Sequence, residues 1–222
     1  MPFDFLRRRK QPAAGGSGGA AKTRAVASRE RPPGGSPIRF DGLTEEWRLQ
    51  GTMHIEGRLV EVLNRREAVP ISDVSWAPID GSSPFTAVPG LKSVDPYDLI
   101  IVLAGPASKP PLSEAEKAAY TVHRVPFDVA MEAPPFRIVG TVYLLPGTEP
   151  ARLLDRGTEM FVPVVDAVAK LGDRPVTEGE TESILVNRFY LRAIDQIDKR
   201  TGERPLQLPG QPLGGTSWQE RH

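Results

Sequence analysis

Two aspartates lie at matching places in the chain and are its candidate chemical groups. Asp73 stands in the run Val-Pro-Ile-Ser-Asp-Val, and Asp166 stands in the run Val-Pro-Val-Val-Asp-Ala. If the two halves of the chain pack about a two-fold axis, the two carboxylates would face each other and could bind a cation or perform acid–base chemistry. The alternative, which the residue types favour, is that each Asp ends a strand or turn and accepts backbone N–H bonds.

No other signature of catalysis, of a cofactor or of a metal site is found in the sequence. There are no cysteines, which excludes disulfides, thiolate catalysis and cysteine-ligated metals. The histidines, His54, His123 and His222, have no second histidine or carboxylate at ligand spacing, and there is no Gly-x-Ser-x-Gly nucleophile motif. We therefore expect a protein that is not an enzyme, with no catalytic, cofactor-binding or metal-binding residues and no cofactor.

Three partial motifs for nucleotide or RNA binding are incomplete. The run Gly16–Thr23 lacks the glycine before Lys22 that a phosphate-binding loop requires, and it follows a basic run instead of a strand. The run Asp73-Val-Ser resembles part of the PilZ signature for cyclic dinucleotides but lacks its arginines and its glycine. Asn187-Arg188 resembles the turn through which Sm-like barrels contact RNA. A PilZ-like or Sm-like regulator that binds RNA or a small nucleotide ligand is thus the alternative function.

Charge is unevenly distributed, although the formal net charge is zero. Residues 1–35 carry eight basic and two acidic side chains, residues 36–104 carry six and ten, and residues 113–198 carry nine and fourteen. The acidic middle argues against a folded surface that grips a phosphate backbone. In the basic arm we identify a candidate tether to an anionic membrane or nucleic acid. Its residues are Phe3, Phe5, Arg7, Arg8, Arg9 and Lys10.

An internal repeat is the strongest pattern in the chain. Four blocks recur in the same order, about 90 residues apart: Trp47–Met53 with Phe136–Val142, Arg58-Leu59 and Leu63 with Arg152–Leu154, Val69–Val74 with Val162–Ala167, and Val94–Leu99 with Val186–Leu191. Ordered blocks at nearly constant spacing indicate duplication of one structural unit. We therefore predict two tandem small β-barrel or β-sandwich-like modules. Modules of this size are near the lower limit for independent stability, so we expect them to share a buried face.

The elements that position these residues are predicted to be strands, from the alternation of apolar and polar residues in Tyr120–Met131 and from apolar runs bounded by turn residues elsewhere. The predicted strands are Ile38–Phe40, Leu49–Glu56, Val69–Trp76 and Leu99–Leu103, then Tyr120–Met131, Phe136–Leu145, Phe161–Leu171, Ser183–Val186 and Tyr190–Ile197. The predicted organisation is a disordered basic arm rich in Gly and Pro (1–35), a first β-module (36–104), a linker (105–112), a second β-module (113–198) and a disordered tail (199–222). The fold class is therefore mostly β.

The motifs of the two modules resemble those of a small bacterial domain family of unknown function. They are Arg58-Leu59 with Leu63-Asn64, Val69 with Asp73, and Val186-Asn187 with Leu191. The resemblance implies the fold and transfers no site residue.

The predicted function follows from the internal repeat and from the lack of catalytic and cofactor-binding motifs in the sequence. We expect a non-enzymatic binding or scaffold protein that offers its tandem modules to a protein partner, with the basic arm as a tether. No run approaches the ~18 apolar residues of a membrane-spanning helix. The order of charges at the start differs from that of a secretory signal. We therefore expect a cytoplasmic protein, peripheral to a membrane if the arm binds one.

Overall fold

The computed structural model describes residues 35–108, 124–155, 157, 159–177 and 181–198, and these residues form a mostly β fold, which confirms the predicted fold class. The first half contains β1 (Ser36–Leu43), β2 (Trp47–Ile55), α1 (Leu59–Asn64), β3 (Val69–Pro70), β4 (Ser72–Pro78), β5 (Thr86–Ala87), β6 (Ser93–Val94), η2 (Pro96–Asp98), β7 (Ile101–Ala104) and η3 (Pro106–Ser108). The second half contains β8 (Val125–Ala133), β9 (Phe136–Leu144), η4 (Pro150–Leu154), β10 (Phe161–Leu171), β11 (Arg174–Pro175), β12 (Ser183–Asn187), η5 (Arg188–Tyr190) and β13 (Ala193–Gln196).

The predicted strands agree with the structure where alternation is long. Strand β10 has the predicted bounds, and β9 ends one residue earlier than predicted. Helix α1 was not predicted, because six residues are too few to show a helical period. Its Leu59 and Leu63, four residues apart, lie on one face and are both buried.

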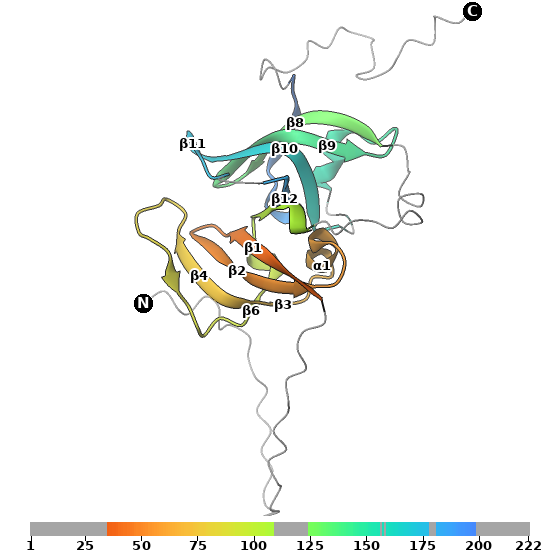
Figure 1. Cartoon of the computed structure of the whole chain (residues 1–222). Helices are drawn as coiled ribbons and strands as arrows, with labels where there is room; N and C mark the ends of the chain where they lie inside the picture. Colours follow the sequence, from red (N-terminus) through yellow and green to blue (C-terminus); the bar gives the residue numbers. More distant parts are fainter. Residues whose placement is uncertain (1–34, 109–123, 156, 158, 178–180, 199–222) are drawn as a thin grey trace, which may run out of the picture. The chain divides into compact units, whose positions relative to one another are not determined.

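Ten strands of the main sheet follow the order β13-β8-β9-β10-β12-β7-β1-β2-β4-β5, and β11 pairs with β10. In Figure 1, β12 runs between the strands of the first half and those of the second. This order has two ends, β13 and β5, so the sheet formed by the described strands is open. The closed barrel that was one of the two predicted forms of the modules is therefore wrong for these strands. A separate two-stranded sheet joins β3 and β6.

Strand pairings in the first half recur in the second half with the same register. Ile38 pairs with Met53, and the residues 89 positions later, Phe127 and Val142, pair with each other. The other matching pairs are Leu49–Trp76 with Ile138–Ala169, Val69–Val94 with Val162–Val186, and Gly42–Val102 with Met131–Ile194. Strand β7 thus has the same place beside β1 that β13 has beside β8.

The two halves meet where β7 pairs with β12. All four residues of β7 are buried, as in a strand covered on both faces. Ile101 and Leu103 belong to the apolar cluster of the second half, whereas Val102 and Ala104 belong to that of the first half. Strand β7 therefore separates two cores and contributes to both.

Each core also contains side chains from the other half. The first-half core includes Met160, Phe161 and Leu185, and the second-half core includes Leu43 and Ile100. The halves accordingly share their apolar interiors through one continuous sheet.

The junction between the halves runs head to tail. A two-fold arrangement would pair β13 with β6, because these strands match β7 and β12. Instead β13 is an end strand and β6 pairs with β3. The two-fold axis that we assumed for a carboxylate pair is therefore not found in the strand order.

Candidate functional site

Asp73 and Asp166 occupy equivalent bulges in β4 and β10. Their φ angles are 52° and 46°, and the strand register shifts at both places. Both residues are exposed. The sheet order places four strands, β12, β7, β1 and β2, between β4 and β10, so no strand pairing brings the two carboxylates together. The positive φ favours Asp for its backbone conformation, which gives each residue a structural reason for its place.

A glycine faces each bulge at close range. A Cβ on Gly51 would lie 2.8 Å from the carbonyl oxygen of Ser72, and a Cβ on Gly140 would lie 2.9 Å from that of Val165. These two glycines are the ones that align in the internal repeat. Their lack of a side chain allows the bulged strand to approach, so the Gly and Asp positions form one structural motif.

The bulge gives a test of Asp73. We expect Asp73→Gly to keep the free energy of unfolding within about 1 kcal/mol of wild type, because glycine adopts positive φ without a Cβ penalty. Asp73→Val should lose about 1–3 kcal/mol through backbone strain. Urea denaturation of both variants measures the difference. An equal or larger loss for glycine than for valine would show that the positive φ is not what favours Asp at this position.

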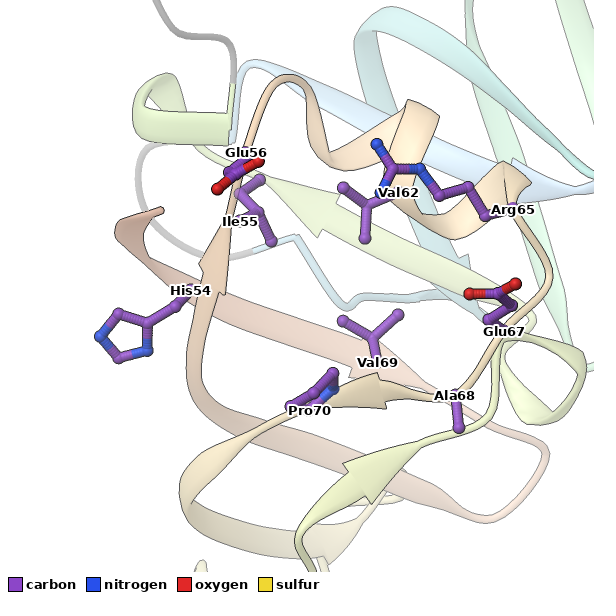
Figure 2. A pocket seen from close by; sticks show the side chains of 9 residues that line it. All are labelled: His54, Ile55, Glu56, Val62, Arg65, Glu67, Ala68, Val69 and Pro70. Carbon is purple, nitrogen blue, oxygen red and sulfur yellow. The ribbon is translucent and has the colours of Figure 1, made fainter. Parts of the chain in front are cut away.

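A pocket of about 220 Å³ lies between α1, the end of β2 and β3. Figure 2 shows the side chains of Val62 and Val69 pointing toward each other across it. The charged ends of Glu56, Arg65 and Glu67 lie around its rim, and the ring of His54 points away. The remaining lining residues are Ile55, Ala68 and Pro70. The pocket therefore combines apolar walls with a rim of both charges.

The local sequence explains why β2 and β3 separate from each other beside the pocket. The ladder between β2 and β4 ends at the pair Thr52–Ser72, next to the bulge. Pro70 has no N–H to donate to β2, and its strand β3 pairs with β6 instead. Strands β2 and β3 therefore diverge, and α1 lies beside the opening.

The charges at the rim are not used to hold the fold. Within the part of the chain that the structure describes, Glu56, Arg65 and Glu67 form no ion pair. By contrast, Arg48 is paired with Asp41 at 2.8 Å, and the two side chains are each 13% exposed. The rim groups thus remain open to a ligand or partner.

The equivalent surface of the second half is covered. Ala68 and Pro70 are exposed, whereas their counterparts Phe161 and Pro163 are buried and half-buried. The side-chain oxygen of Asn64 accepts hydrogen bonds from the backbone N–H of Met160 at 2.8 Å and of Phe161 at 2.7 Å. The first half therefore packs over the place where a second pocket would lie.

Aromatic side chains close the seam between η2 and η5. The rings of Tyr97 and Phe189 stack with centroids 5.9 Å apart, and the guanidinium of Arg66 lies 5.4 Å from the Phe189 ring centre. The Tyr190 hydroxyl donates to the carbonyl oxygen of Tyr97 at 3.0 Å. Burial raises the pKa of the Tyr190 hydroxyl, and the Asp98 carboxylate raises it further, so this hydroxyl stays protonated as a donor.

Burial also raises the pKa of Asp98, with a further contribution from the negative charge of Asp95. The contacts of the described residues given above place no nucleophile and no general base beside Tyr190 or Asp98. The seam is therefore explained as a contact that holds the halves together.

Asn187 holds the same seam from a fully buried position. Its side-chain amide donates to the carbonyl oxygen of Leu99 at 2.7 Å, and its side-chain oxygen accepts from the N–H of Phe189 at 3.0 Å. These hydrogen bonds use the Asn187 side-chain amide, which the Sm-like hypothesis expected to contact RNA.

Several predicted residues lie outside the described part of the chain. These are the tether residues Phe3, Phe5, Arg7, Arg8, Arg9 and Lys10, the run Gly16–Thr23, and His123 and His222. Among the described residues, no cluster of three or more His, Asp or Glu side chains is arranged to hold a metal ion. In the same residues, no helix has the length and apolar character needed to cross a membrane.

The pocket is the feature that sequence reasoning missed. Its only local signal is Pro70 within an alternating strand pattern, which indicates a strand edge. Its lining comes from three elements, so its position depends on long-range packing.

When the chain is compared with protein-family models, with curated proteins and with solved structures, no match is found.

Proposed function

We propose that this chain is a non-enzymatic binding or scaffold protein, formed by duplication of one β-module, and that the first-half pocket is its contact site for a protein partner. The observation that carries the proposal is the rim of Glu56, Arg65 and Glu67. These charges surround apolar walls and form no ion pair within the described residues.

Repeated strand registers support the duplication. The pairs of β1 with β2 and of β8 with β9 match at a constant offset of 89 residues, and three further pairs of ladders match at offsets between 89 and 93 residues. The bulges at Asp73 and Asp166 and the side-chain caps of η2 and η5 by Asp95 and Asn187 add local agreement. Two unrelated modules would have no reason to share all of these details.

The chemistry of the rim favours a protein over a phosphate ligand. Glu56 and Glu67 contribute two negative charges, and Arg65 contributes one positive charge. A phosphate group would be repelled by the excess of carboxylates. A partner segment that inserts a small apolar side chain between Val62 and Val69, next to a basic residue, satisfies both the walls and the rim. RNA or a nucleotide, the alternative ligand, therefore receives less support.

Affinity capture with three baits tests this function. The baits are the wild-type chain, a rim variant (Glu56→Ala, Arg65→Ala and Glu67→Ala), and a control in which the exposed residues Lys170, Asp173 and Arg192 of the second half become Ala. Circular dichroism checks that all three fold.

We expect a specific protein to co-purify with the wild type and the control, and to be depleted about tenfold or more with the rim variant. Retention of every partner by the rim variant, or capture of RNA alone, would overturn the proposal. A fourth bait that lacks residues 1–35 shows whether the basic arm contributes as a tether.

A further inference from the structure

The covered surface of the second half shows which chemical group fits the pocket of the first half. Asn64, the last residue of α1, contacts the second half at Met160 and Phe161. In the repeat these two residues are the counterparts of Glu67 and Ala68, which line the pocket. The contact inside the chain is therefore a template for a ligand of the pocket.

Asn64 binds the second half through its side-chain carboxamide. The oxygen accepts hydrogen bonds from the N–H groups of Met160 and Phe161, and the nitrogen donates to the carbonyl oxygen of Phe161 at 3.2 Å. One side chain thus satisfies two backbone donors and one backbone acceptor. Among neutral side chains of this size, a carboxamide combines an acceptor oxygen with a separate donor nitrogen as this pattern requires.

The same three backbone groups are open in the first half. Glu67 and Ala68 are both exposed, and they precede β3, whose ladder with β6 begins at Val69. Between residues that the structure describes, the N–H groups of Glu67 and Ala68 donate no hydrogen bond and the carbonyl oxygen of Ala68 accepts none. A partner that covered these groups without polar atoms of its own would leave them unsatisfied, which is unfavourable.

We propose that the pocket recognises the side-chain carboxamide of an asparagine in the partner protein. Its oxygen accepts from the N–H groups of Glu67 and Ala68, and its nitrogen donates to the carbonyl oxygen of Ala68. The inference rests on the proposed function, because it names the group that a protein partner brings to the same pocket. A carboxylate fits less well, since it has no hydrogen for the Ala68 carbonyl oxygen and meets a rim with more carboxylates than guanidinium groups.

The neighbours of Asn64 indicate the sequence around such an asparagine. Leu63, which precedes it, is buried, and Arg65 follows it. The order is therefore an apolar residue, asparagine and a basic residue. The pocket suits the same order, because Val62 and Val69 form apolar walls and the rim has an excess of negative charge.

A peptide copied from α1 tests the proposal on the full-length chain. The probe contains residues 58–66 and is capped at both ends, and two matched peptides carry Asn64→Leu or Asn64→Asp. Leucine keeps the size of the side chain without polar atoms, and aspartate keeps the acceptor without the donor. Amide correlation NMR spectra of the isotope-labelled protein follow the N–H groups of Glu67 and Ala68. Since all substitutions are in the peptide, the protein is identical in every titration.

We expect the asparagine peptide to move the N–H resonances of Glu67 and Ala68 downfield, as new hydrogen bonds do. The dissociation constant of the leucine peptide should be about tenfold or more higher, because it makes none of the three hydrogen bonds. The aspartate peptide should also bind more weakly than the asparagine peptide. The proposal would be overturned by unmoved resonances of both residues at about 2 mM asparagine peptide. Equal or tighter binding of the leucine or aspartate peptide would overturn it as well.

The rim variant described above distinguishes this result from the proposed function. Peptide binding at Glu67 and Ala68, combined with affinity capture in which no protein depends on the rim, would contradict the proposed function alone. Rim-dependent capture of a protein, combined with unmoved Glu67 and Ala68 resonances, would contradict the carboxamide alone.

Discussion

Residues 35–108, expressed without the second half, are expected not to fold. The first-half core would lose Met160, Phe161 and Leu185, which come from the other half. Burial of a side chain of this size contributes roughly 1.5–3 kcal/mol each, and the net stability of a whole domain is about 5–15 kcal/mol. Strand β7 would also lose β12, its partner on one edge. Circular dichroism and thermal melting of the fragment should show no cooperative transition.

A cut between the halves provides the matched control. A protease site placed within residues 109–123 leaves the contacts among the described strands intact. After cleavage the two fragments should elute together from a size-exclusion column and melt cooperatively, with the strand content of the uncut chain. Separation of the fragments, or cooperative melting of residues 35–108 alone, would show that the halves are independent domains.

Most strands could be predicted from local runs of aliphatic or alternating residues, although the predicted strand Val69–Trp76 is divided into β3 and β4 and the predicted strand Tyr190–Ile197 begins in η5. Strand β10 has its predicted bounds, and the internal repeat aligned Gly51 with Gly140 and Asp73 with Asp166, which the structure places in matching bulges. The chemistry assumed for the two aspartates depended on a two-fold axis. That axis depends on how the two halves pack against each other, and the alternation of apolar and polar residues along each strand does not determine this packing.

The junction between the two halves could not be predicted from the sequence. Asn64 and Asn187 both make hydrogen bonds between the two halves. Their partners lie about 90 residues away along the chain. The two halves also differ at the positions of these residues, so aligning the blocks of the sequence could not show which contacts they make. Only the sheet order shows that β7 pairs with β12, whereas β13 is an end strand among the described strands.

Asn187→Asp is expected to destabilise the protein by about 3–5 kcal/mol at neutral pH, because it leaves a charge buried without a partner. The Asn187 side chain is 0% exposed and its nitrogen points to the carbonyl oxygens of Leu99 and Pro96. A carboxylate there would keep the cap of Phe189 but repel both carbonyl oxygens. Urea denaturation at several pH values measures the loss.

The pH dependence distinguishes charge from shape. The new carboxyl group would have a folded pKa above the unfolded value of about 3.9, since burial and the carbonyl oxygens favour its neutral form. The loss of stability is therefore complete above the folded pKa and disappears as pH falls below the unfolded pKa, where the protonated group donates to Leu99. Asn187→Ala should instead lose about 1–3 kcal/mol at every pH. Asp95→Asn, its exposed counterpart, should change stability by less than about 0.5 kcal/mol. If the Asn187→Asp deficit were independent of pH, the bond to Leu99 would not be what joins the halves at this place.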